Sequence, residues 1–495
     1  MSQNIKKVVI VGGGTAGWMA AVSISTLIGR DLEVVLVESD DIGTVGVGEA
    51  TIPTFFALHQ LLKINEAEFL SEVQGTIKLG ISFENWKNKG EDYIHAFGYT
   101  GKSCWAAGFQ HFWLKGKDLG FSEEYSKYSP ELMAARQHKF GLLKQNQLNY
   151  AYHIDASLYA KYLRRLAERQ GVVRQEGKVV EVNQTATGNI QDVVLESGVV
   201  INGELFIDCS GFSGLLIDKV LGVGFEDWSH WLPCDSAVAV QTESVSPPVP
   251  YTRSIARDCG WQWRIPLQTR VGNGLVFSSK YLSDDEAKNI LFNNLEGRVL
   301  TEPKVIKFRT GQRSQQWNKN CIALGLAGGF LEPLESTSIH LIQRGIIRLM
   351  QMFPQTEITN ADRDEFNRQM SNEYEFIRDF IIMHYHVTER DDTAFWHYCR
   401  NMEIPESLDH RIRLFKESGR VFQAEGDVFG ENSWTQVMLG QGLIPEQYHP
   451  IVDMMSDLEL QHFLRSIKTS VDNVVGQLPT HQAFLNAYCP VKKTG

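Results

Sequence analysis

A strand, a glycine-rich turn and a helix near the start of the chain predict an α/β protein with a Rossmann-type domain. Two further observations support this fold class. Apolar strands of the same kind recur far downstream, at residues 204–211 and 320–329, so the domain is assembled from segments that are distant in the sequence. From residue 339 onward apolar residues recur mainly at helical spacing, at 339–353, 361–386, 406–418 and 453–470, which predicts an appended, mainly helical part. The same reasoning predicts helices at 55–75 and 156–170, a small antiparallel sheet over 172–207 and a larger sheet over 236–280.

The composition restricts the class of protein. The chain has 495 residues, of which 43% are hydrophobic and 22% are charged, a balance typical of a protein with a buried core. The net charge of −11 argues against nucleic-acid binding, because neutralising phosphates needs clustered lysine and arginine. The apolar runs are shorter than the ~18 residues that suggest a membrane span, and the N-terminal run is too short for a signal peptide.

Seven scattered cysteines without a C-x-x-C pair indicate free thiols in a reducing compartment. We therefore expect a cytoplasmic protein that binds neither membrane nor nucleic acid, and we leave a homodimer open. His384 and His386 are close enough in sequence to suggest a metal pair, but no third ligand accompanies them, so we expect no metal site.

The first motif is G-x-G-x-x-G in the context that it requires. Residues 6–11 predict a buried strand, residues 12–17 supply the glycines, residues 18–27 have helical spacing, and residues 32–37 predict a second buried strand. The first glycine permits the tight turn, the second lets a pyrophosphate approach, and the third lets the helix pack close to the strand.

The helix that follows the turn offers its unpaired amide groups to the phosphates. An acidic residue lies about 20 residues further on, where a carboxylate can bond a ribose hydroxyl. The predicted dinucleotide-binding set is Gly12, Gly14, Thr15, Ala16, Gly17 and Glu38.

Two features favour FAD over NAD. Residues 41–53 are glycine-rich and apolar, where an NAD-binding domain usually continues its parallel sheet. The turn at Asp208–Gly211 resembles the strand-end turn that large flavoproteins place near FAD. One fingerprint is present, so a separate NAD(P)H site is not indicated. We predict a glutathione-reductase-like FAD-binding box domain over residues 1–350, including a substrate-side sheet at about 225–300, and a mainly helical substrate-binding part over 351–495.

Four local sequences in order resemble the flavin-dependent halogenases of the tryptophan halogenase family. They are GVGEATIP at 46–53, TIKLGI at 76–81, GWQWRIP at 260–266 with the family's W-x-W-x-I-P signature, and FLEPLESTSI at 330–339. Shorter matches are HID at 153–155, RDDTAFW at 390–396 and LPTH at 478–481. The resemblance runs along almost the whole chain.

This resemblance implies an FADH2- and O2-dependent halogenase, in which chloride or bromide is oxidised to hypohalous acid at the flavin. It places Lys78 and Glu335 together beyond a tunnel that leads from the flavin. Lys78 then polarises the oxidant or becomes a haloamine, two alternatives that we leave open. Glu335 stabilises the cationic ring intermediate and takes its proton, while Ser336 is an orienting hydroxyl.

Thr337 and Ser338 occupy the family's halide-binding positions, where backbone amides rather than a bulky cation hold the anion. The family usually has glycine at the second position, so Ser338 is a departure that needs a backbone conformation suited to serine. The resemblance completes the expected cofactor-binding set with Gly48, Ala50, Val179, Asp208, Leu326 and Ile339. A separate NAD(P)H-dependent flavin reductase is the expected partner.

The substrate is expected to be a small electron-rich aromatic such as indole or an indole derivative. Tryptophan-specific members hold the amino-acid end with a Tyr-Tyr pair, and this chain has no adjacent tyrosines. The matching region is residues 422–434, which suggests an open or differently built pocket. The expected pocket residues are His95 and Phe97, which sandwich the ring, Trp261 and Trp263, which wall off the flavin, and Trp434.

Two other readings remain open at this point. A single-component flavin aromatic hydroxylase would use the same oxygen chemistry, but it would need NADPH access and an open flavin face. A flavin-bound protein without turnover would need neither Lys78 nor Glu335.

Overall fold

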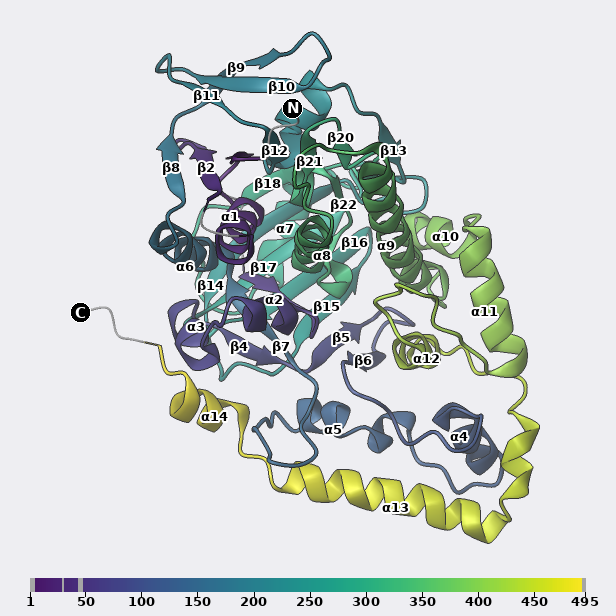
Figure 1. Ribbon diagram of the computed structural model, residues 1–495. Helices are drawn as coiled ribbons and strands as arrows, with labels where there is room; N and C mark the ends of the chain where they lie inside the picture. The colour runs from purple at the N-terminus through teal and green to yellow at the C-terminus, as the bar shows by residue number, and fades with distance from the viewer. Residues whose placement is uncertain (1–4, 29–30, 43–47, 492–495) are drawn as a thin grey trace. The chain divides into compact units, whose positions relative to one another are not determined.

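The structure is a computed structural model that describes residues 5–28, 31–42 and 48–491 (Figure 1). The chain forms two compact units. The first comprises residues 1–74, 154–235 and 307–375, and the second comprises residues 75–153, 236–306 and 376–495. This division differs from the expected one, which grouped the sheet near 225–300 with the cofactor-binding segments. The assignment of domains by function stays a prediction.

The first unit is built on a six-stranded sheet with the order β20-β21-β12-β1-β2-β8. Five strands are parallel and β20 is antiparallel. The strands are β1 (Lys7–Val11), β2 (Glu33–Glu38), β8 (Val173–Glu176), β12 (Leu205–Asp208), β20 (Trp317–Asn318) and β21 (Cys321–Ala323). Helix α1 (Thr15–Leu27) packs on α6 (Ala156–Arg169) and α8 (Ser338–Gln351). This is the predicted Rossmann-type arrangement.

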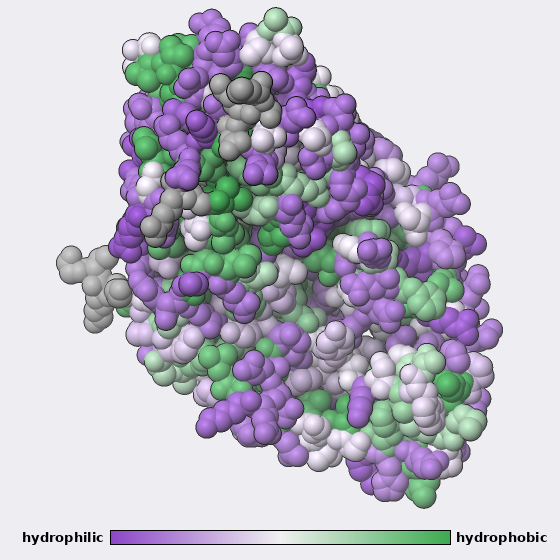
Figure 2. Space-filling view, in the orientation of Figure 1, coloured by the Kyte–Doolittle hydropathy of each residue, from purple (hydrophilic) through white to green (hydrophobic). Residues whose placement is uncertain are grey.

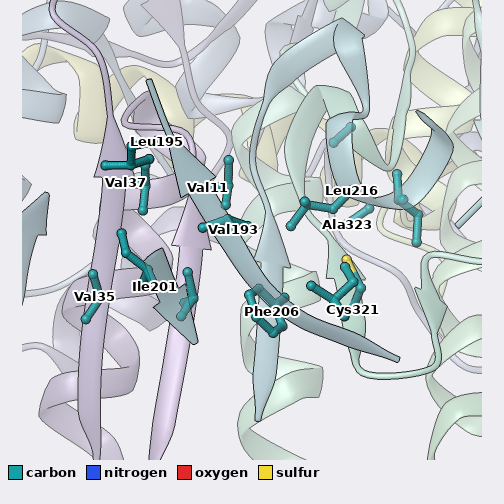
Figure 3. Close-up of a cluster of buried hydrophobic side chains, with 14 of the residues drawn as sticks. Val11, Val35, Val37, Val193, Leu195, Ile201, Phe206, Leu216, Cys321 and Ala323 are labelled. Carbon is teal, nitrogen blue, oxygen red and sulfur yellow. The ribbon is translucent and has the colours of Figure 1, made fainter. Parts of the chain in front are cut away.

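The core of this unit lies between the parallel sheet and a small antiparallel one (Figure 3). The small sheet has the order β11-β10-β9 and consists of β9 (Val179–Gln184), β10 (Ile190–Leu195) and β11 (Val200–Asn202). Buried side chains from both sheets meet there: Val11, Val35, Val37, Val193, Leu195, Ile201, Phe206, Cys321 and Ala323. The prediction of one antiparallel sheet over residues 172–207 was wrong at its ends, because β8 and β12 join the parallel sheet instead.

Shorter elements complete the first unit. The single helix expected at 55–75 is interrupted, since Lys63 has a φ of 54° and Asn65 begins a new helix by accepting a hydrogen bond from the Glu68 amide. The elements are β3 (Gly48–Ala50), α2 (Phe55–Leu61), α3 (Glu66–Glu72), a π-helix (Leu215–Val220), β13 (Phe225–Asp227), β19 (Gly311–Arg313) and β22 (Gly329–Phe330). The last three strands form a small antiparallel sheet in the order β13-β19-β22.

The second unit contains the larger sheet that was predicted over residues 236–280. Its order is β18-β14-β17-β16-β15-β5-β6, and from β14 to β6 neighbouring strands are antiparallel except β15 with β5, which are parallel. The strands are β5 (Gly80–Glu84), β6 (Asp92–Ala96), β14 (Ser236–Glu243), β15 (Thr252–Arg257), β16 (Gly260–Pro266), β17 (Arg270–Phe277) and β18 (Lys304–Lys307). A separate short strand, β4 (Thr76–Lys78), pairs antiparallel with β7 (Ala151–Asp155).

Helices make up most of the chain after residue 338, as predicted. The helices expected at 339–353, 361–386, 406–418 and 453–470 correspond to α8, α9 (Asn360–His386), α11 (Glu406–Ser418) and α13 (Asp457–Gly476). The others are α4 (Phe109–Asp118), α5 (Pro130–Arg136), α7 (Asp284–Asn293), α10 (Ala394–Asn401), α12 (Glu431–Gly440) and α14 (His481–Tyr488). Within the described ranges, no helix combines the length and the apolar character that a membrane crossing needs.

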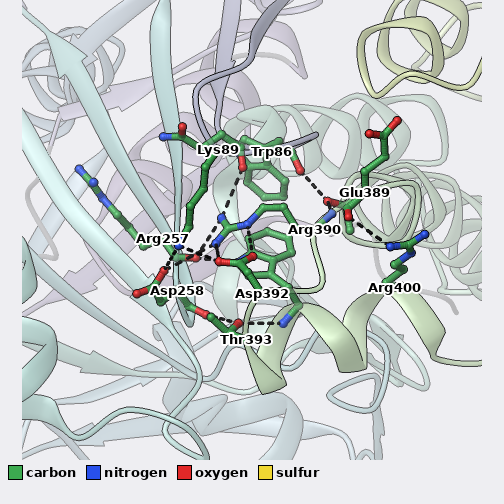
Figure 4. A network of polar contacts seen from close by, with 12 residues as sticks. Trp86, Lys89, Arg257, Asp258, Glu389, Arg390, Asp392, Thr393 and Arg400 are labelled. Carbon is green, nitrogen blue, oxygen red and sulfur yellow. Dashed lines mark hydrogen bonds and ion pairs between the residues drawn. The ribbon is translucent and has the colours of Figure 1, made fainter.

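A polar network around Arg390 connects several segments of the second unit (Figure 4). The Arg390 guanidinium donates to both oxygens of Asp392, at 2.9 and 3.1 Å, and lies 4.5 Å from the centre of the Trp396 ring. Lys89 bridges Asp392 and Asp258 at 2.7 and 3.2 Å. The RDDTAFW match therefore has a structural role, since it fixes the start of α10 to the β15–β16 turn.

On the face shown in Figure 2 hydrophilic residues predominate, and hydrophobic residues form separate patches among them. Scattered apolar residues on a mainly polar surface are ordinary for a folded protein.

Candidate active site

The glycine turn after β1 has the geometry that its sequence requires. Gly12 has a φ of +117°, and a Cβ atom there would lie 2.2 Å from the Cys209 carbonyl oxygen. A Cβ atom on Gly17 would lie 1.8 Å from the Gly12 carbonyl oxygen, so the helix can approach the strand only without a side chain. Gly14 differs, because a Cβ atom there would meet no atom within 4 Å. There is thus no room for a side chain at Gly12 or Gly17, whereas the space beside Gly14 is open, as a bound pyrophosphate needs.

The start of α1 is suited to an anion. Gly14 precedes the helix without a capping side chain, and the first turn carries no acidic residue. The amide groups of Thr15 and Ala16 therefore remain available at the positive end of the helix. A Cβ atom on Gly325 would lie 3.0 Å from that of Ala16, which places the neighbourhood of Leu326 beside the glycine turn.

Glu38 lies next to the glycine turn, where its carboxylate could also bond a ribose hydroxyl. Its Oε1 accepts a hydrogen bond from Arg174 Nε at 2.5 Å, and its Oε2 lies against Gly13, whose Cβ position would be 1.5 Å away. The glycine turn, the helix start and this carboxylate occur together in one unit. On this geometry the residues fit a dinucleotide cofactor.

Asp208, the last residue of β12, anchors the turn that follows this strand. Its buried carboxylate accepts hydrogen bonds from the amides of Ser210, Leu216 and Ile217 at 2.7 to 2.9 Å. Asp208 thus shapes the turn that holds the Cys209 carbonyl against Gly12, and direct contact with the cofactor stays a prediction. The same is true of Gly48 and Ala50 on β3, Val179 on β9, Leu326, and Ile339 in α8.

The predicted halide positions lie at the start of α8. Thr337 precedes the helix and Ser338 is its first residue, so serine is accommodated in an ordinary helical conformation. The Thr337 side chain is completely buried, and its hydroxyl has no hydrogen-bond partner among the residues that the structure describes. A buried hydroxyl and the positive end of a 14-residue helix make a setting that favours a small anion.

The residues before Thr337 form a tight turn. Glu335 ends a short 3-10 helix (Pro333–Glu335), and its side chain is 1% exposed. Ser336 adopts a left-handed backbone conformation with a φ of 61°, which is uncommon for a residue with a side chain. This turn places Glu335 directly ahead of the halide positions in the chain.

A buried network fixes the first turn of α8. His340 Nδ1 lies 2.8 Å from the Thr54 hydroxyl, and His340 Nε2 lies 2.6 Å from Glu373 in α9. Glu373 also contacts Arg344 and Arg348. Burial would raise the pKa of Glu373, but the His340 hydrogen bond and the charges of His340 and the two arginines lower it to about 2. The ionised carboxylate thus anchors the helix that carries the predicted halide site.

Lys78 lies in the second unit, at the end of β4, and it is completely buried. Its Nζ lies 5.0 Å from the centre of the Phe97 ring. A buried ammonium group is costly unless other groups stabilise its charge, and an aromatic face does so electrostatically. Lys78 is therefore not a solvent-exposed surface lysine, the environment in which most lysines are found.

His95, one of the two predicted ring-sandwiching residues, belongs to a larger aromatic cluster. The His95 ring lies 5.6 Å from Phe380 and 6.4 Å from Phe429, and the last two are stacked at 3.8 Å. Trp434 packs edge-on against Phe380 at 4.8 Å, and Arg411 covers its ring at 4.0 Å. Sequence reasoning did not identify Phe380, because in a long amphipathic helix an apolar residue has the same pattern whether it lines a pocket or fills a core.

Trp261 and Trp263 lie next to one another on β16, with ring centres 6.2 Å apart. They are 1% and 7% exposed. Trp263 covers Gly274 on β17 so closely that a Cβ atom there would lie 2.1 Å from the indole ring. Its indole Nε1 has no hydrogen-bond partner within the described part of the chain. The role of the two tryptophans as a wall stays a prediction.

Lys78, the aromatic cluster and the two tryptophans belong to one unit, and Glu335, Ser336 and the halide positions belong to the other. The expected pairing of Lys78 with Glu335 therefore stays a prediction. In the ranges that the structure describes, no three histidine, cysteine, aspartate or glutamate side chains gather as metal ligands.

The fold and the glycine turn define an α/β protein of the dinucleotide-binding class. A family model described as tryptophan halogenase matches residues 7–457. Tryptophan 7-halogenase RebH from Lentzea aerocolonigenes is 33% identical, over 98% of this chain and 99% of that protein.

Two solved structures are similar throughout. Xcc4156, a flavin-dependent halogenase from Xanthomonas campestris, is 54% identical with a TM-score of 0.98 and covers 100% of both chains. BrvH, a flavin-dependent halogenase from Brevundimonas sp. BAL3, is 43% identical with a TM-score of 0.94, over 98% of this chain and 99% of its own.

The chain belongs to the tryptophan halogenase family. It is a flavin-dependent halogenase, an enzyme that halogenates an aromatic substrate with reduced FAD supplied by a separate flavin reductase. Membership implies the use of FAD and of a halide. The resemblance drawn from the four motifs is confirmed, and the two alternative readings are set aside.

Proposed function

We propose that this enzyme halogenates an indole-type ring by passing hypohalous acid to Lys78. The observation that carries the proposal is the position of Lys78, completely buried and over the Phe97 ring. A cation held away from water against an aromatic face can hold and polarise an electrophilic oxidant.

The halide is expected to bind at Thr337 and Ser338. When reduced FAD is bound, O2 would be the oxidant: FADH2 and the halide would each give up two electrons, and the two oxygen atoms would end in hypohalous acid and in water. The buried Thr337 hydroxyl can donate a hydrogen bond to the halide, and the start of α8 can stabilise its negative charge. Chloride and bromide both fit this chemistry.

Lys78 is proposed to hold the hypohalous acid while the ring attacks the halogen. In the overall exchange the ring carbon gains the halogen and loses its proton, and the hydroxyl group of the oxidant leaves as water. Glu335 is proposed to stabilise the cationic ring and to accept that proton, with Ser336 orienting the carboxylate. Both residues lie in a buried turn, where a carboxylate acts more strongly than in water.

The substrate is proposed to be indole or an indole derivative without a free amino-acid end. The cluster around His95, Phe380 and Phe429 offers aromatic surface for a flat ring. The chain has no Tyr-Tyr pair, and its residues 422–434 use the buried Asp427 to hold Arg411 at 3.0 Å. Because Asp427 and Arg411 already form an ion pair with each other, they do not replace the Tyr-Tyr pair as an anchor for an amino-acid end.

One assay tests this function. The enzyme is mixed with indole, bromide, FAD, NADH and a flavin reductase, and the product is read by mass spectrometry. A bromine isotope pattern on indole supports the proposal. A gain of one oxygen without bromine, or the absence of any brominated indole, would contradict it.

A further inference from the structure

Two buried histidines from distant parts of the chain hold the strand that ends in Lys78. His153 lies on β7 and is 0% exposed, and His481 begins α14 and is 1% exposed. His153 contacts Thr76 and His481 contacts Ile77, the two residues before Lys78 on β4. Neither contact belongs to the chemistry of the halogenation itself.

The contacts fix the tautomer of His481. The Ile77 amide can only donate, and it lies 3.2 Å from His481 Nε2, which must therefore carry a lone pair. The ring proton is then on Nδ1, which donates to the Pro248 carbonyl at 2.8 Å. Protonating the ring fully would place a second donor against the Ile77 amide and break this bond.

The same reasoning assigns the donor and the acceptor of each hydrogen bond around His153. The Thr76 hydroxyl donates to the Pro266 carbonyl at 2.7 Å, because a carbonyl can only accept. The hydroxyl oxygen then accepts from His153 Nδ1 at 2.8 Å, and His153 Nε2 accepts from the Thr252 hydroxyl at 3.0 Å. Pro266 ends the W-x-W-x-I-P strand, so this chain of bonds joins that strand to the Lys78 strand.

Both rings are neutral. Burial, and then the nearby charge of Lys78, holds the pKa of His153 well below its usual range. Burial lowers the pKa of His481 to about 4, although its bond to Pro248 opposes the shift. Two neutral rings can therefore bind the strand on both sides without adding positive charge near Lys78.

We propose that His153 and His481 are positioning residues, which fix the backbone of β4 and so hold the Lys78 amine at one point over Phe97. The inference rests on the role proposed for Lys78. It explains how a strand of only three residues can hold a catalytic side chain in place. The Ile77 amide and the Thr76 hydroxyl are bonded to buried imidazole rings, which replace the many backbone hydrogen bonds of a longer strand.

The test uses matched pairs of variants. His481→Phe keeps a ring but loses both bonds, whereas His481→Gln keeps an acceptor for the Ile77 amide and a donor for Pro248. Thr76→Val has nearly the same shape but breaks the link to Pro266 and His153, and Thr76→Ser retains it. Each variant is measured in two ways, and the first needs neither flavin nor substrate.

The first measurement is hydrogen–deuterium exchange of the peptide that covers residues 74–80. We expect faster exchange in His481→Phe, and protection restored in His481→Gln. The second measurement is the ratio of halogenated indole to hypohalous acid captured by a soluble trap. We expect about a tenfold shift toward the trap in His481→Phe and Thr76→Val, with the sum of the two products nearly unchanged, because misplacing a catalytic group by about 1 Å can cost up to about a hundredfold.

The inference is overturned if the ratio stays at the parental value in both of these variants. It is equally overturned if product and trapped oxidant fall together, because that result indicates general damage rather than a displaced amine. Lys78→Ala is run beside them. If Lys78→Ala keeps making halogenated indole, then the role proposed for Lys78 fails, whatever the histidine variants do.

Discussion

At the scale of single residues, Lys78 is more deeply buried than any other lysine that the structure describes, whereas Thr337 shares its complete burial with Thr76, Thr242 and Thr310. Lys78 lies beside an aromatic ring, and Thr337 lies at a helix start. A polar group that is removed from water usually has a partner, because leaving it without one costs about 1–3 kcal/mol. The hydroxyl of Thr337 lacks one among the described residues, and a bound halide would supply it.

Lys78→Ala should abolish halogenation while FAD binding and hypohalous acid formation persist, because the lysine acts after the oxidant has formed. Product formation and trapped oxidant are measured in the same reaction, and flavin binding is measured by fluorescence. Product formation at more than about a tenth of the parental rate would refute the assignment, since removing a group that acts in the transition state costs about 10²-fold or more. Loss of FAD binding would instead make Lys78 structural.

Thr337→Val should raise the KM for halide about tenfold and leave FAD affinity unchanged. The two side chains have almost the same shape, but valine cannot donate a hydrogen bond to an anion, and such a charge-assisted bond is worth about 1.5–3 kcal/mol. The measurement is the initial rate of product formation against bromide concentration. Thr337→Ser serves as the matched control, because it keeps the hydroxyl. An unchanged KM in Thr337→Val would exclude Thr337 from the halide site.

At the scale of elements, local features could be predicted from the sequence and distant contacts could not. The strand–glycine turn–helix unit at residues 7–27 is encoded within one short segment, so its prediction was confirmed. The break between α2 and α3 was missed, because it depends on Lys63 adopting a left-handed conformation in an apolar stretch. The contacts of His153 and His481 with β4 were also missed, since nothing in either local sequence points to residues 76–78.

The segment 422–434 leads to a prediction about substrate choice. Indole should be halogenated in preference to free tryptophan, because the ammonium and carboxylate of tryptophan find no Tyr-Tyr anchor here. If the pocket is closed, these charges would lose water without gaining partners, at a cost of several kcal/mol. If it is open, they stay hydrated, and tryptophan simply gains nothing from them.

Competition between indole and tryptophan in one vessel measures this preference. Indole should react at the pyrrole-ring carbon next to the bridge carbon, where electrophilic attack is intrinsically fastest, because no clamp turns another position toward Lys78. Preferential halogenation of tryptophan on its benzo ring would show that an anchor exists in other residues.

At the scale of the whole molecule, the sequence has one dinucleotide-binding motif, which is enough for one dinucleotide cofactor. Gly12–Gly17 has the required geometry, and the sequence contains no second copy of the motif. The FAD-loaded enzyme should therefore not oxidise NAD(P)H by itself. The absorbance of NADPH at 340 nm should stay constant until a flavin reductase is added. Rapid decay without the reductase would reveal a nicotinamide site that the sequence does not show.

Several buried groups should give the protein a pH-dependent stability. Burial lowers the pKa of His59 to about 3, and it lowers the pKa values of His111 and His481 to about 4. An unfolded histidine binds its proton near pH 6.5, so between pH 6.5 and 4 the unfolded chain binds more protons than the folded one. Stability should fall as the pH drops through this window, by up to about 1.4 kcal/mol per pH unit for each such histidine.

Glu49 acts in the opposite direction. Burial, with a smaller contribution from the charge of Asp155, raises the pKa of its carboxyl group to about 7. The folded protein therefore holds that proton between pH 7 and 4.5, where the unfolded chain releases it, and its contribution to stability is lost as the pH rises through this range. Burial also raises the pKa values of the Glu131 and Asp427 carboxyl groups, and it lowers the pKa values of His153 and His386. Three carboxyl groups thus oppose five histidines, so the histidines should dominate the net effect.

The thermal midpoint should accordingly decrease from pH 6.5 to pH 4.5, and two variants separate the contributions. His481→Gln should make the decrease shallower, because it removes one group that takes up a proton on unfolding. Glu49→Gln should make it steeper, because it removes the group that compensates. Scanning calorimetry at fixed ionic strength measures all three proteins. A midpoint that rises as the pH falls from 6.5 to 4.5 would mean that the buried histidines do not control stability in this range, and that Glu49 or other carboxyl groups do.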